Sequence, residues 1–227
     1  MKRDLLKYLD KNKDVEYKNF ISRLIPNLDK DFIIGVCTPI LRSIAKEIIE
    51  NKKEEEYLNK LPHEYYEQYQ IHSILLSQKM EYNKLITHLE AFLPYINNWA
   101  TCDTLIPKID NKNLEDFYKH ILIWINSNHE YTVRFGIYMI MKNYLNNLNI
   151  DKYLKDIIRI KSDKYYINMM ISWTLAEALW IDYDKTIKYL ENKNLNKFVQ
   201  NKAIQKAIES RKLSSDIKDY LKTLKTR

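Results

Sequence analysis

The sequence predicts an all-α fold. Apolar residues recur at helical spacing along almost the whole chain of 227 residues. The chain has only two glycines and five prolines, too few for the many tight turns of an all-β fold. Short polar clusters such as Asn51-Lys52-Lys53 and Asn192-Lys193-Asn194 interrupt the pattern. We therefore expect about a dozen helices joined by short turns.

Seven segments carry the helical pattern most clearly. The first covers residues 39–50, where two adjoining i, i+4 rows are apolar: Ile40, Ile44 and Ile48 beside Leu41, Ala45 and Ile49. Thr38 followed by Pro39 predicts an N-cap and a proline in the first helical position. The pattern then recurs over residues 64–79, 81–93, 114–126, 130–146, 165–180 and 196–210. Within these elements Gly136 predicts a close approach between helices, and Gly35 predicts a turn before Thr38.

The helices fall into pairs of roughly 30 to 45 residues, the size of helical-repeat units. The pairs lack strict sequence identity, so periodicity alone leaves both a solenoid and a general helical bundle open. The segments 115–126 and 165–180 are apolar on more than one face, as expected for helices packed between neighbours in a solenoid. No long low-complexity linker divides the chain, so we expect a single domain over residues 1–227.

Positive charge is concentrated at the C-terminal end. Residues 193–227 contain ten Lys or Arg and three acidic side chains, a surplus of seven that equals the formal net charge of +7. The preceding 192 residues are therefore balanced. A neutral body with a basic end favours a polyanionic partner such as nucleic acid, although basic terminal helices are also common solvated faces.

Several classes of protein and site are not indicated. No apolar run approaches the length of a membrane span, and the first residues lack a signal-peptide core, so we expect a cytoplasmic protein without a membrane partner. Cys37 and Cys102 are far apart and form no C-x-x-C pair. The five histidines lack metal-binding spacing, and no nucleotide-binding glycine pattern or Ser-His-Asp arrangement is present. We therefore expect neither a metal nor a cofactor.

The segment Asn97-Asn98-Trp99-Ala100-Thr101-Cys102-Asp103 has the composition of a chemical site. On a helix, Trp99 and Asp103 share one face about one turn apart. An indole face beside a carboxylate suits a cationic, flat or sugar-bearing ligand, because ring and anion attract the same partner. Trp99 could alternatively be a core anchor, and Asp103 could cap a helix or pair with a lysine.

Four motifs, in order, resemble a known family. Gly35-Val36-Cys37-Thr38-Pro39-Ile40-Leu41-Arg42 is similar to the G-[IV]-x-x-P-x-x-R signature of the DNA alkylation repair (AlkD-type) glycosylases. Trp99 and Asp103 resemble the W-x-x-x-D of that family, and Val133-Arg134-Phe135-Gly136-Ile137 its central arginine-bearing helix. Met170-Ile171-Ser172-Trp173 resembles a run that ends in an aromatic residue. Order and spacing agree from about residue 15 to 210.

The resemblance implies a right-handed superhelix of HEAT-like antiparallel helix pairs that holds duplex DNA containing alkylated bases, as a monomer. It also implies removal of cationic 3-alkyl and 7-alkyl purines by hydrolysis of the glycosidic bond. Asp103 would stabilise an oxocarbenium-like sugar and position water. Trp99 and Trp173 would lie against the lesion's deoxyribose and backbone, and Arg134 would anchor a phosphate. Lys202 and Lys206 would add DNA contacts, and the protein would associate with the nucleoid when bound.

The chain also departs from the family pattern, which points to a divergent branch. Where the related glycosylases have an arginine before a glutamate after the Trp173 position, this chain has Thr174-Leu175-Ala176-Glu177. Their aromatic pair is replaced by Asn98-Trp99, and their later Arg-rich repeat by residues 201–206. A non-catalytic binder of damaged or branched DNA therefore stays open, as does a helical scaffold that binds an acidic protein.

Some of these side chains have structural interpretations as well. Arg134 could form an ion pair with Glu130 or Asp103. Trp180, two turns after Trp173, is best explained as a packing residue. Glu177, between the two tryptophans, is a second candidate carboxylate.

Overall fold

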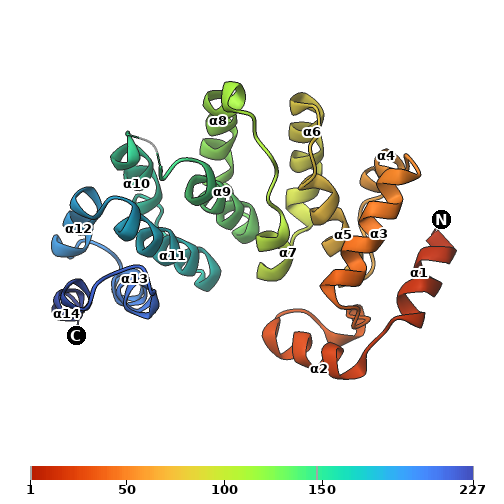
Figure 1. Ribbon diagram of the computed structural model, residues 1–227, viewed down its shortest axis with the longest axis horizontal. Coiled ribbons are helices and arrows are strands. Elements are labelled where there is room, and N and C mark those ends of the chain that lie inside the picture. Colours follow the sequence, from red (N-terminus) through yellow and green to blue (C-terminus); the bar gives the residue numbers. More distant parts are fainter. Residues whose placement is uncertain (1, 147, 227) are drawn as a thin grey trace. The chain divides into compact units, whose positions relative to one another are not determined.

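The computed structural model describes residues 2–146 and 148–226, and every regular element in that part of the chain is helical (Figure 1). The predicted all-α fold is confirmed. The chain divides into two compact units, Met1–Asn113 and Leu114–Arg227. Each unit is described by itself, and the expectation of a single domain over residues 1–227 stays a prediction.

The first unit stacks helices in two layers. Helices α3, α5 and α7 pack one after another, and α4 and α6 both pack on α5. The helices of this unit are α1 (Lys2–Lys11), α2 (Val15–Leu24), α3 (Thr38–Glu50), α4 (Glu54–Leu58), α5 (Tyr66–Leu76), α6 (Tyr82–Phe92) and α7 (Trp99–Thr104). Three short 3₁₀ turns lie at Lys30–Phe32, Leu93–Tyr95 and Asn111–Asn113.

The second unit repeats this two-layer arrangement. Helices α9, α11 and α13 form one layer, while α10 packs on α12 and α8 packs on α9. The helices of this unit are α8 (Leu114–Trp124), α9 (Glu130–Asn143), α10 (Ile150–Ile158), α11 (Tyr165–Ile181), α12 (Tyr183–Glu191), α13 (Lys197–Glu209) and α14 (Ser215–Thr223). Helix α11 is buried on most of its surface because it packs against α9, α10, α12 and α13. Repeating pairs whose central helices are covered on several sides are typical of helical-repeat proteins.

The predicted helix segments match observed helices, with one correction at an N-terminus. Helix α3 begins at Thr38 itself, so the N-cap is Cys37, whose side chain makes no capping bond. The reason lies in the preceding turn, where Gly35 has a φ of 101° and its N–H donates to the buried Glu67 at 2.7 Å. The backbone N–H groups of Ile34 and Val36 donate to the same carboxylate. This anchoring by Glu67 fixes the chain just before α3 without a capping side chain.

The close approach predicted at Gly136 is confirmed. A Cβ atom built on Gly136 would lie 2.7 Å from Cγ2 of Ile125, which directly follows α8. Carbon atoms in contact lie about 3.5–4.0 Å apart, so no side chain fits there without a shift. Glycine therefore lets α9 lie tightly against the end of α8.

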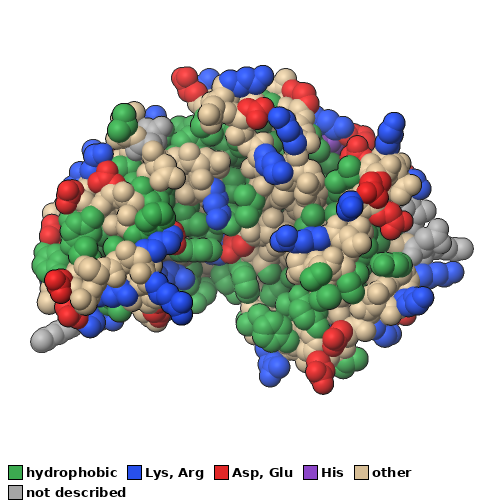
Figure 2. Space-filling view, in the orientation of Figure 1, with side chains coloured by type: hydrophobic (Ala, Val, Ile, Leu, Met, Phe, Trp, Pro, Cys, Tyr) green, Lys and Arg blue, Asp and Glu red, His purple; other side chains and the backbone are tan. Residues whose placement is uncertain are grey.

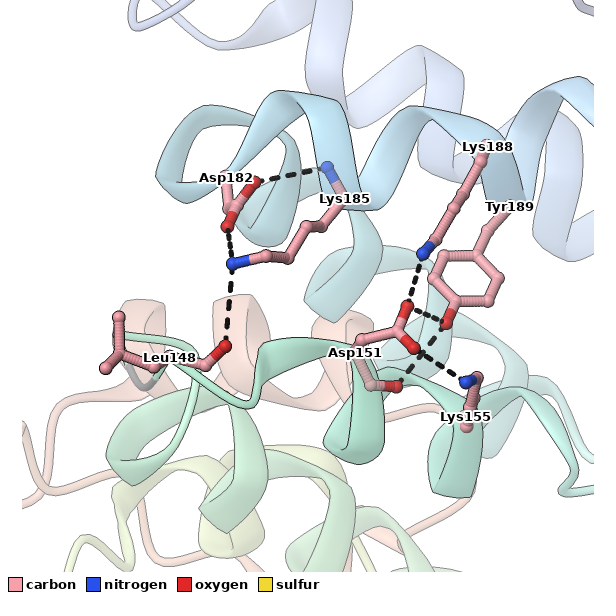
Figure 3. A network of polar contacts seen from close by, with 7 residues as sticks. All are labelled: Leu148, Asp151, Lys155, Asp182, Lys185, Lys188 and Tyr189. Atoms are coloured by element: carbon pink, nitrogen blue, oxygen red, sulfur yellow. Dashed lines mark hydrogen bonds and ion pairs between the residues drawn. The ribbon is translucent and has the colours of Figure 1, made fainter.

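A polar cluster joins α10 to α12 in the second unit (Figure 3). The carboxylate of Asp151 accepts hydrogen bonds from Lys155, Lys188 and the Tyr189 hydroxyl at 2.6–2.7 Å. These three donors hold the pKa of Asp151 far below its usual value. In the same view Lys185 pairs with Asp182 at 2.8 Å. All of the charged groups drawn there are paired with one another, which identifies this cluster as structural.

Candidate nucleic-acid interface

Helix α7 presents the predicted Trp99 and Asp103 pair. The side chain of Asn98 caps this helix by accepting the Thr101 N–H at 2.8 Å. Trp99 is the first helical residue, and Asp103 follows one turn later. Both residues are half-buried, so each combines contact with the protein interior and access to solvent. The structure thus places an indole and a carboxylate on neighbouring turns of one short helix.

Trp99 also has a packing role. Its indole N–H donates at 2.9 Å to the carbonyl of Leu24, the last residue of α2. Its ring packs against a buried cluster made of Ile21, Ile25, Ile33 and Tyr66. Trp99 therefore anchors α2 to α7, and only part of the indole is left for a ligand.

Arg134 lies in the interior of the second unit and is 5% exposed. Its Nη1 donates to the Tyr166 carbonyl at 2.9 Å, while Glu130 accepts the Tyr166 N–H at 3.1 Å. Arg134 and Glu130 lie one turn apart on α9, so the two charged side chains hold the first turn of α11 by its backbone. The phosphate contact expected of Arg134 stays a prediction.

Helix α11 presents an aromatic cluster around Trp173. The ring of Trp173 stacks on Tyr138 of α9, with the ring centres 6.0 Å apart. The Nζ of Lys206, on α13, lies 5.4 Å from the centre of the Trp173 ring. A lysine at this distance is attracted by the electron-rich face of the indole. Three helices of the second unit thus bring a half-buried tryptophan, a tyrosine and a cation together.

Glu177 joins this cluster to Trp180. One carboxylate oxygen accepts the Trp180 indole N–H at 2.8 Å, and the other lies 3.4 Å from Nε1 of Trp173. Lys212 donates to Glu177 at 3.1 Å and lies 3.7 Å from the centre of the Trp180 ring. Burial raises the pKa of Glu177, but the bonds from Trp180 and Lys212 outweigh it, so the pKa lies below its usual value. Glu177 is therefore an ionised carboxylate held by three donors.

Trp180 departs from its predicted packing role. It is 42% exposed, although it lies two turns from Trp173 on the same helix. The packing interpretation fails because the ring is exposed and the side chain of Lys212 lies over its face.

The predicted basic residues of α13 lie on the accessible side of the second unit. Lys202 and Lys206 are half-exposed, and Lys202 bonds to Gln205 at 2.9 Å on the same helix. Figure 2 shows lysine and arginine side chains gathered over α11 and α13, among apolar and neutral ones. A surface that combines cations with aromatic rings is suited to bind nucleic acid. Phosphates pair with the cations, and bases or sugars lie on the rings.

The sequence was compared with known protein families. The family model described as DNA alkylation repair enzyme matches residues 1–210. The chain belongs to this family. No curated protein sequence matches the chain. Membership of the DNA alkylation repair family supports a role in DNA repair, with DNA as the partner.

The family match covers every motif that the sequence analysis singled out, from Gly35 to Trp173. Trp99 and Asp103 lie together on α7 in the first unit. Trp173 and Lys206 lie together in the second unit, and Arg134 reaches α11 through Tyr166. The structure therefore brings Trp99 near Asp103 in the first unit and Lys206 near Trp173 in the second.

Sequence reasoning missed two members of the α11 cluster in this repair protein. Lys212 lies 35 positions after Glu177, and no local pattern connects them. Tyr138 stacks on Trp173 from another helix, which periodicity alone does not show. Only the spacing of Trp173, Glu177 and Trp180 at one-turn intervals could have indicated that the three side chains meet.

Neither a metal centre nor a membrane span is found in the parts of this repair protein that the structure describes. There, no three His, Cys, Asp or Glu side chains gather closely enough to hold a metal ion. Over the same residues, no helix is both long and apolar enough to cross a bilayer.

Proposed function

We propose that the protein is a monofunctional DNA glycosylase that removes cationic 3-alkyl and 7-alkyl purines from duplex DNA. The observation that carries the proposal is the pairing of Trp99 and Asp103 one turn apart on α7, in a chain of the DNA alkylation repair family. The aromatic and basic surface of α11 and α13 supports DNA contact independently.

The chemistry asked of Asp103 is modest. An alkylated purine is already positively charged, so the C1′–N bond breaks without a strong general acid, and its electron pair neutralises the departing base. Positive charge then develops on the sugar, and a carboxylate nearby stabilises it. Water adds to C1′ and releases one proton, which Asp103 accepts and passes to solvent. Asp103 thus acts as electrostatic stabiliser and general base.

The remaining residues bind the DNA in this proposal. The half-buried indoles of Trp99 and Trp173 lie against the sugar and backbone of damaged DNA, where their electron-rich faces favour cationic character. Lys202 and Lys206 pair with phosphates, and Arg134 supports α11 and contacts a phosphate. Because no lysine serves as a nucleophile, the enzyme leaves an abasic site without cutting the strand.

The decisive experiment measures release of 7-methylguanine from methylated duplex DNA by wild type and Asp103→Asn. We expect release by the wild type and a loss of about 100-fold or more in the variant, the scale on which electrostatic stabilisation acts. Duplex binding by Asp103→Asn should stay within about twofold of wild type, since one carboxylate contributes little to phosphate contact. Failure of wild-type protein to release any alkylated base would contradict the proposal.

A non-catalytic binder of damaged or branched DNA is the second candidate. It is favoured by the segment Thr174-Leu175-Ala176-Glu177, in which Glu177 is fully engaged and Ala176 is buried and carries no charge. Preferential binding of methylated or branched duplex without base release would support this candidate. Weak binding that is insensitive to salt would instead favour a protein scaffold, because phosphate contacts depend steeply on salt.

A further inference from the structure

Helix α7 is docked on α5 by a run of hydrogen bonds. The amide of Gln70 donates to the Thr101 hydroxyl at 3.1 Å and accepts from the Thr104 hydroxyl at 2.9 Å. Ser73 donates to the Thr101 carbonyl at 3.1 Å, and the Ser77 hydroxyl is shared between the Ser73 carbonyl at 2.7 Å and the Thr104 carbonyl at 3.2 Å. The three α5-side residues are spaced three and four positions apart, so they form one polar stripe along α5 and its C-cap.

This stripe lies largely inside the first unit. Gln70 is 3% exposed, and both Ser73 and Thr101 are fully buried. A buried donor or acceptor that loses its partner is strongly disfavoured, so the stripe favours one arrangement of α7 over others. Apolar contacts carry no such directional demand, because the hydrophobic effect is not directional.

Helix α7 depends on this docking. It has six residues, far fewer than an isolated helix needs to be stable in water. Its first turn is fixed by the Asn98 cap and the packing of Trp99. Its second turn, which carries Asp103, is fixed on one side by Thr101 and on the other by Thr104.

We infer that Gln70 is a positioning residue that sets the direction of Asp103, because one side chain amide holds the threonines on both sides of it. The inference rests on the proposed catalytic role of Asp103. Removal of a Gln70 contact leaves the fold and the DNA-binding surface in place but lets α7 shift against α5, most of all at its second turn. A displacement of about 1 Å at a catalytic group can lower a rate about 100-fold.

The test compares variants at Thr104, which is half-buried and tolerates substitution better than Gln70. Thr104→Val keeps the shape of the side chain but removes the hydroxyl that bonds to Gln70, whereas Thr104→Ser keeps the hydroxyl. Thr87→Val is the matched control, since the Thr87 hydroxyl is exposed and bonds to Asn83 within α6. Gln70→Leu then removes both contacts at once.

The first readout is single-turnover base release from methylated duplex, alongside duplex binding and thermal unfolding. We expect Thr104→Val and Gln70→Leu to lower the release rate at least about 10-fold with binding unchanged. Thr104→Ser and Thr87→Val should retain the wild-type rate. Equal rates in all variants, or a loss of binding that parallels the loss of rate, would overturn the inference.

The second readout does not depend on activity. In protein labelled with 5-fluorotryptophan, the ¹⁹F resonance of Trp99, assigned with Trp99→Phe, reports the placement of α7. Thr104→Val should shift or broaden this resonance, and Thr104→Ser should not. If the wild type releases no base, the proposed function fails, while this resonance still decides whether Gln70 positions α7. An unchanged resonance in both Thr104→Val and Gln70→Leu would contradict the inference.

Discussion

In α11 the indole N–H of Trp180 donates to Glu177 at 2.8 Å, and this carboxylate also holds Lys212 over the face of the same indole. The Glu177 carboxylate thereby holds the indole N–H of Trp180 and also keeps Lys212 over the face of the same exposed ring. The arrangement ties the segment between α13 and α14 to α11, and it keeps Lys212 beside the surface proposed to bind DNA.

Replacement of Glu177 by Gln should weaken this arrangement. The amide still accepts the Trp180 N–H, but the attraction to Lys212 loses its charge, so we expect a loss of about 1 kcal/mol in the free energy of unfolding. Urea unfolding followed by tryptophan fluorescence measures the change. Glu47→Gln, at an exposed position on α3, is the control and should have no measurable effect. Equal stability of the two variants would show that the pairing contributes nothing.

The basic residues of α13 should determine the salt dependence of duplex binding. Replacement of Lys202 and Lys206 by Gln should lower the slope of log K against log salt by up to about 2, because each phosphate contact contributes about 0.9. Fluorescence anisotropy with a labelled duplex at several salt concentrations measures the slope. The same substitution at Lys46, an exposed lysine of α3, should leave the slope unchanged. If the double variant kept the wild-type slope, α13 would not be part of the DNA interface.

Stability should fall with acid because of a buried histidine. His72 is fully buried and stacks on Phe92, and burial, with smaller contributions from His63 and His88, holds its pKa well below the usual value. The unfolded chain therefore binds a proton on His72 more readily than the folded protein does. The contribution of His72 to the free energy of unfolding is fully present above about pH 6.5. It decreases by up to about 1.4 kcal/mol per pH unit as the pH falls below that value.

Urea unfolding of wild type and His72→Leu from pH 7.5 to 5 measures this effect. Tyr57 and His63, whose rings lie beside His72, are common to both proteins. We expect the wild type to lose more stability than the variant over this range. Parallel curves would show that His72 does not carry the acid sensitivity.

Substitution of Gly136 by Ala should destabilise the second unit, even though alanine favours helices. The gain in helix propensity is about 1 kcal/mol, but the new Cβ would overlap Cγ2 of Ile125, and overpacking costs about 1–3 kcal/mol. Thermal unfolding measures the net loss. Ile125→Ala removes the overlapping atom, so Gly136→Ala should be less harmful in that background. If the stability effects of Gly136→Ala and Ile125→Ala simply added in the double variant, the close approach would be contradicted.

Local patterns were sufficient for the seven predicted helical segments and for the spacing of Trp99 and Asp103. The apolar rows in residues 39–50 predict α3 because helical periodicity depends only on neighbours three or four positions apart. The same spacing places Trp99 and Asp103 on neighbouring turns of α7. Short-range information does not fix where a cap falls, which is why α3 begins at Thr38 instead of one residue later.

The sequence by itself determined that this chain is all-α, where its main helices lie, that Gly136 admits a close neighbour, and which family it resembles. Only the tertiary structure decided that Trp180 is exposed, that Glu177 meets Lys212, and that Gln70 bonds on both sides of Asp103. The physical reason is distance along the chain. Residues about 30 positions apart meet only when whole helices pack, and that packing depends on the summed burial of many side chains.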